Sequence, residues 1–101
     1  MPTWKFLSNH AQVLLCVAGD PGIRLRDIAT SVGITERAAH RIVADLVTDG
    51  YLSRERRGRR NHYEVQDHRP LPDPLLPDRR LADLLTLLTG PDGRKVAKPS
   101  T

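Results

Sequence analysis

The stretch "RDIATSVGITERAAHRIVADLVTDG", residues 26 to 50, decides the fold that we predict for this chain. Residues 26–33 have the apolar spacing of a short helix, and Gly33 suits the left-handed position that follows a helix. Thr35 is a good N-cap for a second, longer helix, which Asp49-Gly50 ends. Two helices joined through Gly-Ile-Thr predict a helix-turn-helix motif.

The second helix is predicted to have one apolar stripe and one polar face. The stripe is aliphatic, and its members are Ala39, Ile42, Val43 and Leu46. The polar side chains lie off this stripe, and they are Glu36, Arg37, His40 and Arg41. Such a helix packs with the stripe inward and leaves the polar face available to a ligand.

An arginine-rich segment follows the two helices. The flanks "YLSRER" and "NHYEVQ" alternate like strands, and five arginines lie within residues 54–60. A two-residue turn at Arg57-Gly58 would place Leu52 opposite Tyr63 and Glu55 opposite Arg60, although a longer loop around Gly58 is also open. The segment is either a solvated turn or a hairpin tip that contacts phosphate, and its position after a helix with Arg37 and Arg41 favours phosphate contact.

Residues 25–65, "LRDIATSVGITERAAHRIVADLVTDGYLSRERRGRRNHYEV", resemble a winged helix-turn-helix of the bacterial ArsR/MarR type of transcriptional regulator. The elements that carry this resemblance are "LRDIA", "GIT", the aliphatic stripe running to "DGYL", and the "GRRNHY" wing, within roughly residues 8–66. The implied fold class is α+β and mostly helical, a winged helix-turn-helix with a C-terminal amphipathic helix.

In proteins of this type the second helix enters the DNA major groove, and the wing reaches the flanking backbone or minor groove. The residues that the resemblance places at the groove are Thr35, Glu36, Arg37, His40 and Arg41. The residues that it places on the wing are Arg54, Arg56, Arg57, Arg59 and Arg60. Double-stranded DNA is therefore the expected partner.

The chemistry of these side chains agrees with that expectation. The Thr35 hydroxyl and the N–H groups at a helix start can hold a phosphate, and Arg37 or Arg41 can form two hydrogen bonds to guanine. Glu36 either accepts a hydrogen bond from cytosine or only favours the helix N-terminus electrostatically. The alternative for His40 is that it contacts only the DNA backbone or a phosphate.

Composition restricts the remaining function classes. The chain has 101 residues, a net charge of +4 and a pI of about 9.8, which suggests an anionic partner. A single cysteine, Cys16, excludes an internal disulfide and is expected to pack on an apolar helix. With no apolar run of ~20 residues and no apolar signal-peptide region, we expect a cytoplasmic protein away from membranes.

The sequence contains no motif for catalysis or for a bound cofactor. It has one cysteine and four scattered histidines, without metal-ligand spacing. It also lacks a Gly-rich phosphate loop and a nucleophile motif. We therefore expect no enzyme activity, no metal and no cofactor.

Residues 9–18, "NHAQVLLCVA", indicate a helix before the motif, with Asn9 as its cap and Gln12 as the partner in a capping box. This helix is apolar nearly all round, so it should be covered on both sides. After the break at "GDPG", the stretch "IRL", residues 23–25, is short and β-like.

The C-terminal part begins with "HRPLPDPLLP", residues 68–77, which we call the strap and expect to run extended because it is proline-rich. Residues 78–90 predict a helix capped by Asp78 and stopped by Gly90, and residues 91–101 look disordered. The helix carries a stripe of Leu81, Leu84, Leu85 and Leu88. This stripe packs either on the chain's own first helix or on a second subunit, and we favour a homodimer interface that Trp4 and Phe6 extend.

The predicted organisation is a winged-helix domain over residues 1–67, the strap, and a dimerisation helix. The function that we predict is sequence-specific binding of double-stranded DNA by a transcriptional regulator. Two alternatives remain, namely a winged helix that binds structured RNA and a winged helix that only makes protein contacts.

Overall fold

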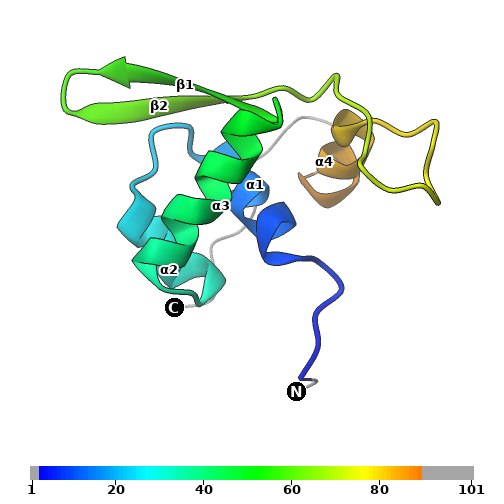
Figure 1. Ribbon diagram of the computed structural model, residues 1–101, viewed down its shortest axis with the longest axis horizontal. Coiled ribbons are helices and arrows are strands. Elements are labelled where there is room, and N and C mark those ends of the chain that lie inside the picture. The colour runs from blue at the N-terminus through cyan, green and yellow to red at the C-terminus, as the bar shows by residue number, and fades with distance from the viewer. Residues whose placement is uncertain (1–2, 90–101) are drawn as a thin grey trace.

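The computed structural model of the protein describes residues 3–89. Along the chain, its elements are α1 (Asn9–Gly19), α2 (Leu25–Val32), α3 (Glu36–Thr48), β1 (Leu52–Arg57), β2 (Arg60–Val65) and α4 (Leu81–Thr89). Figure 1 shows α1, α2 and α3 gathered in the middle, the β1–β2 hairpin projecting on one side and α4 lying on the other. The predicted fold class, a mostly helical α+β winged helix, is confirmed.

The core is aliphatic and lies between the first three helices. Figure 1 shows these helices together below the hairpin. Each of the three helices contributes buried side chains to the core, which are Val13, Leu14, Val17, Ile28, Ala29, Ala39, Ile42, Val43 and Leu46. Leu52 and Tyr63 join them from the base of the hairpin, and Leu81 joins them from α4. All four residues of the predicted α3 stripe are among them. Burial of this one face fixes which side of α3 remains in solvent.

The helix-turn-helix is built as its local sequence predicts. Gly33 has a φ of 83° and ends α2, and its N–H donates to the Ala29 carbonyl at 2.8 Å. The Thr35 hydroxyl caps α3 by accepting from the Ala38 N–H at 3.0 Å. Both caps satisfy backbone groups that a helix end leaves free, so the turn holds the two helices in a defined geometry.

Two predictions in the first third of the chain are wrong. Ser8, not Asn9, caps α1, with its hydroxyl accepting from the Ala11 N–H at 3.1 Å. Asn9 is already helical, and its side chain instead accepts from the Lys5 ammonium at 2.7 Å. Residues 23–25 form no strand, because α2 already begins at Leu25.

The hairpin exists, but its predicted register is wrong. The two-residue turn is Gly58-Arg59, with Leu52 paired to Val65 and Glu55 paired to His62 rather than to Arg60. Gly58 has a φ of 61°, and no other residue of the turn has a positive φ. A turn with positive φ only at its first central position favours glycine there, which moves the turn one residue along. The partner of each β1 residue shifts by two, so every side chain keeps its predicted face.

The strap does not run extended away from its domain. Together with residues 78–80 it forms a loop, which an isolated bridge between Pro70 and Arg80 closes. The Leu71 N–H donates to the Arg79 carbonyl at 2.9 Å, and the Leu81 N–H donates to the Arg69 carbonyl at 2.8 Å. The loop therefore returns α4 to its own domain, as Figure 1 shows.

The C-terminal helix starts later than predicted. Its first residue is Leu81, and Asp78 precedes it by three positions and does not cap it. The Asp83 carboxylate instead accepts from the Arg80 N–H at 2.9 Å, as the third residue of a helix does in a capping box. Gly90 and the predicted disordered tail, residues 91–101, lie outside the described residues.

Candidate nucleic-acid interface

The outward face of α3 is polar and uncovered. Thr35, Glu36, Arg37, His40 and Arg41 are all exposed, opposite the buried stripe. Because Arg37 and Arg41 are four residues apart, their guanidinium groups lie on the same side of the helix, one turn from each other. The structure therefore brings together the five side chains that the sequence singles out on this helix.

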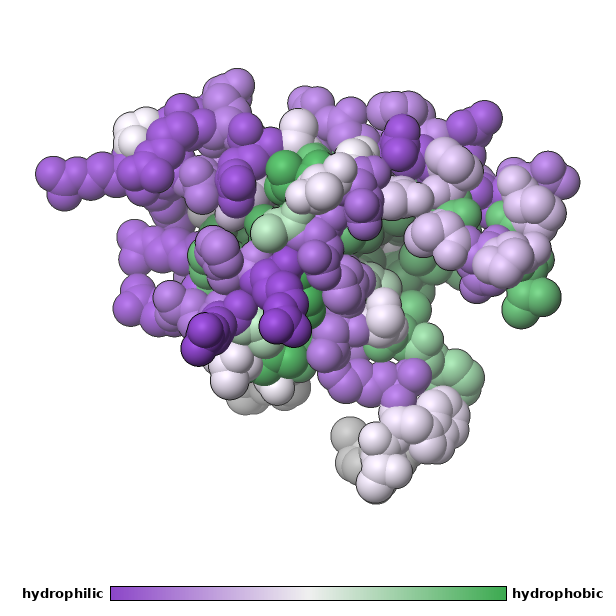
Figure 2. All heavy atoms as spheres, viewed as in Figure 1, coloured by the Kyte–Doolittle hydropathy of each residue, from purple (hydrophilic) through white to green (hydrophobic). Residues whose placement is uncertain are grey.

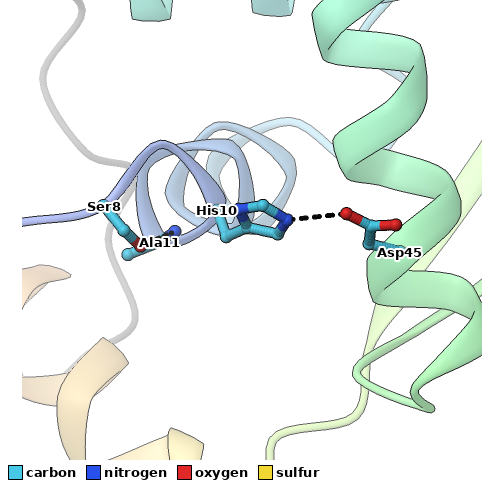
Figure 3. Close-up of polar contacts among 4 residues, drawn as sticks. All are labelled: Ser8, His10, Ala11 and Asp45. Carbon is cyan, nitrogen blue, oxygen red and sulfur yellow. Dashed lines mark hydrogen bonds and ion pairs between the residues drawn. The ribbon is translucent and has the colours of Figure 1, made fainter.

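An ion pair marks the far end of this face. Asp45 follows Arg41 by one helical turn, and its carboxylate lies 2.9 Å from Nε2 of His10 in α1 (Figure 3). Both side chains are about half exposed. The basic part of α3 is therefore its N-terminal half. Nothing in the sequence indicated this pair, because the two residues are 35 positions apart.

The five hairpin arginines are exposed, and they differ in what they contact. Nε of Arg57 lies 2.7 Å from the Glu55 carboxylate, and Nε of Arg56 donates to the Gly58 carbonyl at 3.2 Å. The Arg57 hydrogen bond and charge lower the pKa of Glu55, so this carboxylate stays ionised and neutralises Arg57. Arg54, Arg59 and Arg60 form no ion pair within the described part of the chain.

A hollow of about 410 Å³ separates the hairpin from the start of α2. We call it the arginine hollow, because its lining contains Arg24, Arg26, Arg59 and Arg60, together with Glu36 and Asn61. Arg24 and Arg26 are not among the site residues predicted from the sequence. Their spacing in "IRLRD" was a weak indication, and the predicted strand at residues 23–25 obscured it.

The residues predicted to form the dimer interface differ widely in how exposed they are. Leu81 is 2% exposed and belongs to the chain's own core, and Leu84 and Leu85 pack against that core. Leu88 is 38% exposed, while Trp4 and Phe6 lie in solvent with their rings edge to face at 4.7 Å. The idea that the whole leucine stripe is free for a partner is therefore wrong.

The two sides of the molecule differ in polarity. In Figure 2, hydrophilic residues cover the upper left, where the hairpin lies, and hydrophobic residues gather on the right, over α4 and the N-terminal segment.

Cys16 is half-buried on α1, and burial raises the pKa of its thiol, so it stays protonated at neutral pH. None of the described helices has the length and apolar composition of a membrane span.

Comparison with known proteins identifies a family that this chain matches. Residues 6–60, more than half of the chain, match the model described as the MarR family. Among solved structures, the chain is similar to the zinc-dependent MarR family transcriptional regulator AdcR in its Zn(II)-bound state, with 17% sequence identity and a TM-score of 0.47. That match covers 66% of this chain and 47% of AdcR, so the chain spans less than half of that regulator's length. No curated protein matches the sequence.

Proposed function

Because the chain belongs to the MarR family, we propose that it is a transcriptional regulator that binds double-stranded DNA. In this proposal α3 enters the major groove, and the hairpin contacts the flanking backbone or minor groove. The observation that carries the proposal is the uncovered face of α3, which presents Arg37 and Arg41 to solvent. The start of this helix, at Glu36, lines the same hollow as Arg59 and Arg60 of the hairpin.

The dimensions and charge of this face suit DNA. The 13 residues of α3 give a helix about 20 Å long, and the major groove of B-DNA is about 12 Å wide and admits one helix. The hairpin segment from residue 52 to residue 63 has five arginines and one glutamate, a net charge of +4. Phosphate contacts made by such a tip would supply affinity without sequence preference.

Base reading is assigned to the arginines of α3. Arg37 and Arg41 lie in the N-terminal half of the helix, which is the part that reaches base edges in helix-turn-helix proteins. A guanidinium donates two hydrogen bonds to the O6 and N7 atoms of guanine. Thr35 precedes the two arginines and His40 lies between them, and we assign both to contacts with the DNA backbone.

The experiment begins with selection of bound sequences from random duplexes. With the selected duplex in hand, Arg37→Ala and Arg41→Ala should each reduce discrimination against a scrambled duplex by about 1–3 kcal/mol. Arg79→Ala is the matched control, because Arg79 is exposed just before α4 and belongs neither to α3 nor to the hairpin. Equal losses on both duplexes would place these arginines on the backbone, and a structured RNA that competes as well as the selected duplex would contradict the proposal.

We also propose that two copies of the chain act together. A dimer presents two reading helices about 34 Å apart, which matches successive major grooves on one side of DNA. Because most of the leucine stripe packs on its own core, we assign the dimer contact to apolar side chains that remain exposed. Leu87 is 79% exposed and Phe6 is 91% exposed. Phe6→Asp with Leu87→Asp should give a folded monomer with weaker binding, and a wild type that sediments as a monomer at micromolar concentration would rule the dimer out.

A further inference from the structure

The arginine hollow is a basic feature that the face of α3 does not include. Two of its arginines, Arg59 and Arg60, come from the hairpin, and the other two, Arg24 and Arg26, come from the start of α2. Residues that are more than 30 positions apart are therefore brought to one cavity. Glu36 at the start of α3 contributes its single acidic side chain.

The positive charges in the hollow are not neutralised within the described part of the chain. Its two ion pairs are His10–Asp45 and Arg57–Glu55, and neither involves a residue of the hollow. Four arginines against one glutamate give the lining residues an excess of positive charge. Like charges gathered in one hollow repel each other, so an anion that enters it relieves that repulsion.

Backbone donors add to this electrostatic preference. No side chain caps α2, whose N-cap residue is Arg24 itself. The first N–H groups of a helix favour a negative charge, and Leu25 and Arg26, the first two residues of α2, line the hollow. A water occupies ~30 Å³ of liquid, so a hollow of about 410 Å³ has room for a phosphodiester group and its hydration.

The position of the hollow indicates which anion it takes. It lies between the start of α3, at Glu36, and the tip of the hairpin, at Arg59 and Arg60. If α3 occupies the major groove and the hairpin contacts the adjacent minor groove, the DNA strand that separates the two grooves must pass between them. We propose that the arginine hollow seats a phosphate of that strand, held by Arg24 and Arg26 on one side and by the hairpin arginines on the other.

This inference rests on the proposed DNA binding and adds two residues to it. Arg24 and Arg26 are positioning residues that fix the approach of the hairpin to the backbone, and they read no base. Their contribution is the same on every sequence, because phosphates carry no sequence information.

The test compares two double variants of equal charge in the full-length protein. Arg24→Gln with Arg26→Gln should weaken binding to selected and scrambled duplexes alike and should flatten the slope of log affinity against log salt by about 1.8, or 0.9 for each contact. Lys5→Gln with Arg79→Gln removes the same charge from exposed sites outside the hollow and should change the slope by less than half as much.

Two further measurements keep the outcome interpretable. Arg24→Lys with Arg26→Lys should retain most of the wild-type slope, and thermal unfolding should show that each variant is folded. Equal slopes for the two glutamine doubles would overturn the phosphate seat while leaving DNA binding intact. A wild type that binds no duplex at low salt would instead overturn the proposed function itself.

Discussion

The hairpin and the strap both leave the helical core, and they differ in which groups satisfy their backbones. The hairpin pairs with itself, β1 against β2, and its side chains from Ser53 to Arg60 are exposed. Hydrogen bonds tie the strap, and the residues on either side of it, to the rest of the chain. The Tyr51 hydroxyl donates to the Pro70 carbonyl at 2.9 Å, and the Ala82 N–H donates to the Asp67 carbonyl at 2.8 Å.

This difference shows that arginine content alone does not identify a binding surface. Within the strap, Nη2 of Arg69 donates to the Asp49 carbonyl at 3.1 Å, and the Arg69 guanidinium lies 5.6 Å from the centre of the Tyr51 ring. Nη1 of Arg80 donates to the His68 carbonyl at 2.7 Å. These arginines hold the chain together, whereas Arg59 and Arg60 line an open hollow. Variants on the two segments should therefore separate stability from binding.

The largest expected effect is on the strap side, at the residue that the returning chain places in the core. Leu81→Ala should lower the free energy of unfolding by about 2–5 kcal/mol, because it removes a side chain that is 2% exposed and leaves a cavity. Leu87→Ala is the control on the same helix and should change stability by less than about 0.5 kcal/mol. Urea unfolding measures both, and equal values would mean that α4 is not docked on its own domain.

The part of this architecture that the sequence predicts is the part encoded by neighbouring residues. Gly33 and Thr35 mark the helix ends through their own backbone and side-chain chemistry, and the spacing of the α3 stripe requires no knowledge of its partners. The exposed face that carries Arg37 and Arg41 follows directly from that stripe. The fold and the exposed polar face of α3 were accordingly predictable from the sequence alone.

The rest depends on contacts between distant residues. Alternation predicted two strands, but it did not show that Gly58 takes the first turn position. Prolines predicted an extended strap, because each fixes its own φ, yet the bridge between Pro70 and Arg80 is what closes the loop. The arginine hollow was missed for the same reason, since only the packed fold brings Arg24 and Arg26 close to the hairpin.

The next effect is on the hairpin, where binding should change and stability should not. Arg59→Ala is expected to flatten the salt dependence of DNA affinity by about 0.9, with an unchanged thermal midpoint, because its side chain is exposed. Arg57→Ala should flatten it less, since Glu55 already neutralises this guanidinium. Binding titrations over a range of salt concentrations compare the two variants. If neither slope changes, the hairpin is only a solvated turn.

A smaller effect is expected where the strap meets the hairpin base. Tyr51→Phe removes the hydrogen bond to the Pro70 carbonyl and should lower the free energy of unfolding by about 0.5–1.5 kcal/mol. The ring itself remains, so its contact with Arg69 is retained. Because the Tyr51 hydroxyl bonds to the strap and not to the hairpin arginines, the salt slope of DNA binding by Tyr51→Phe should equal that of the wild type. A changed slope would show that the strap also positions the hairpin.

The smallest effect concerns Glu55, the acid that pairs with Arg57 on the hairpin. The Arg57 hydrogen bond and charge lower the pKa of this carboxyl, so the stability gained from the pair is complete above the ordinary carboxyl range and is lost as pH falls through the lowered pKa. Both side chains are mostly exposed, so this gain is small. In an NMR titration, Arg57→Ala should return the Glu55 pKa toward its ordinary value, while Arg79→Ala should leave it lowered.

The same pair makes a prediction about binding that has the opposite sign to every other hairpin variant. Glu55→Gln removes a negative charge and frees Arg57, so the affinity for selected and scrambled duplexes should rise together, and the salt slope should steepen by at most about 0.9. Glu64→Gln is the matched control, because Glu64 is exposed on the neighbouring strand and accepts a hydrogen bond from Gln66 rather than from an arginine. If Glu55→Gln instead weakened binding, Glu55 would be positioning Arg57 for a phosphate contact. Arg57 would then join Arg59 and Arg60 among the arginines that we propose to contact DNA.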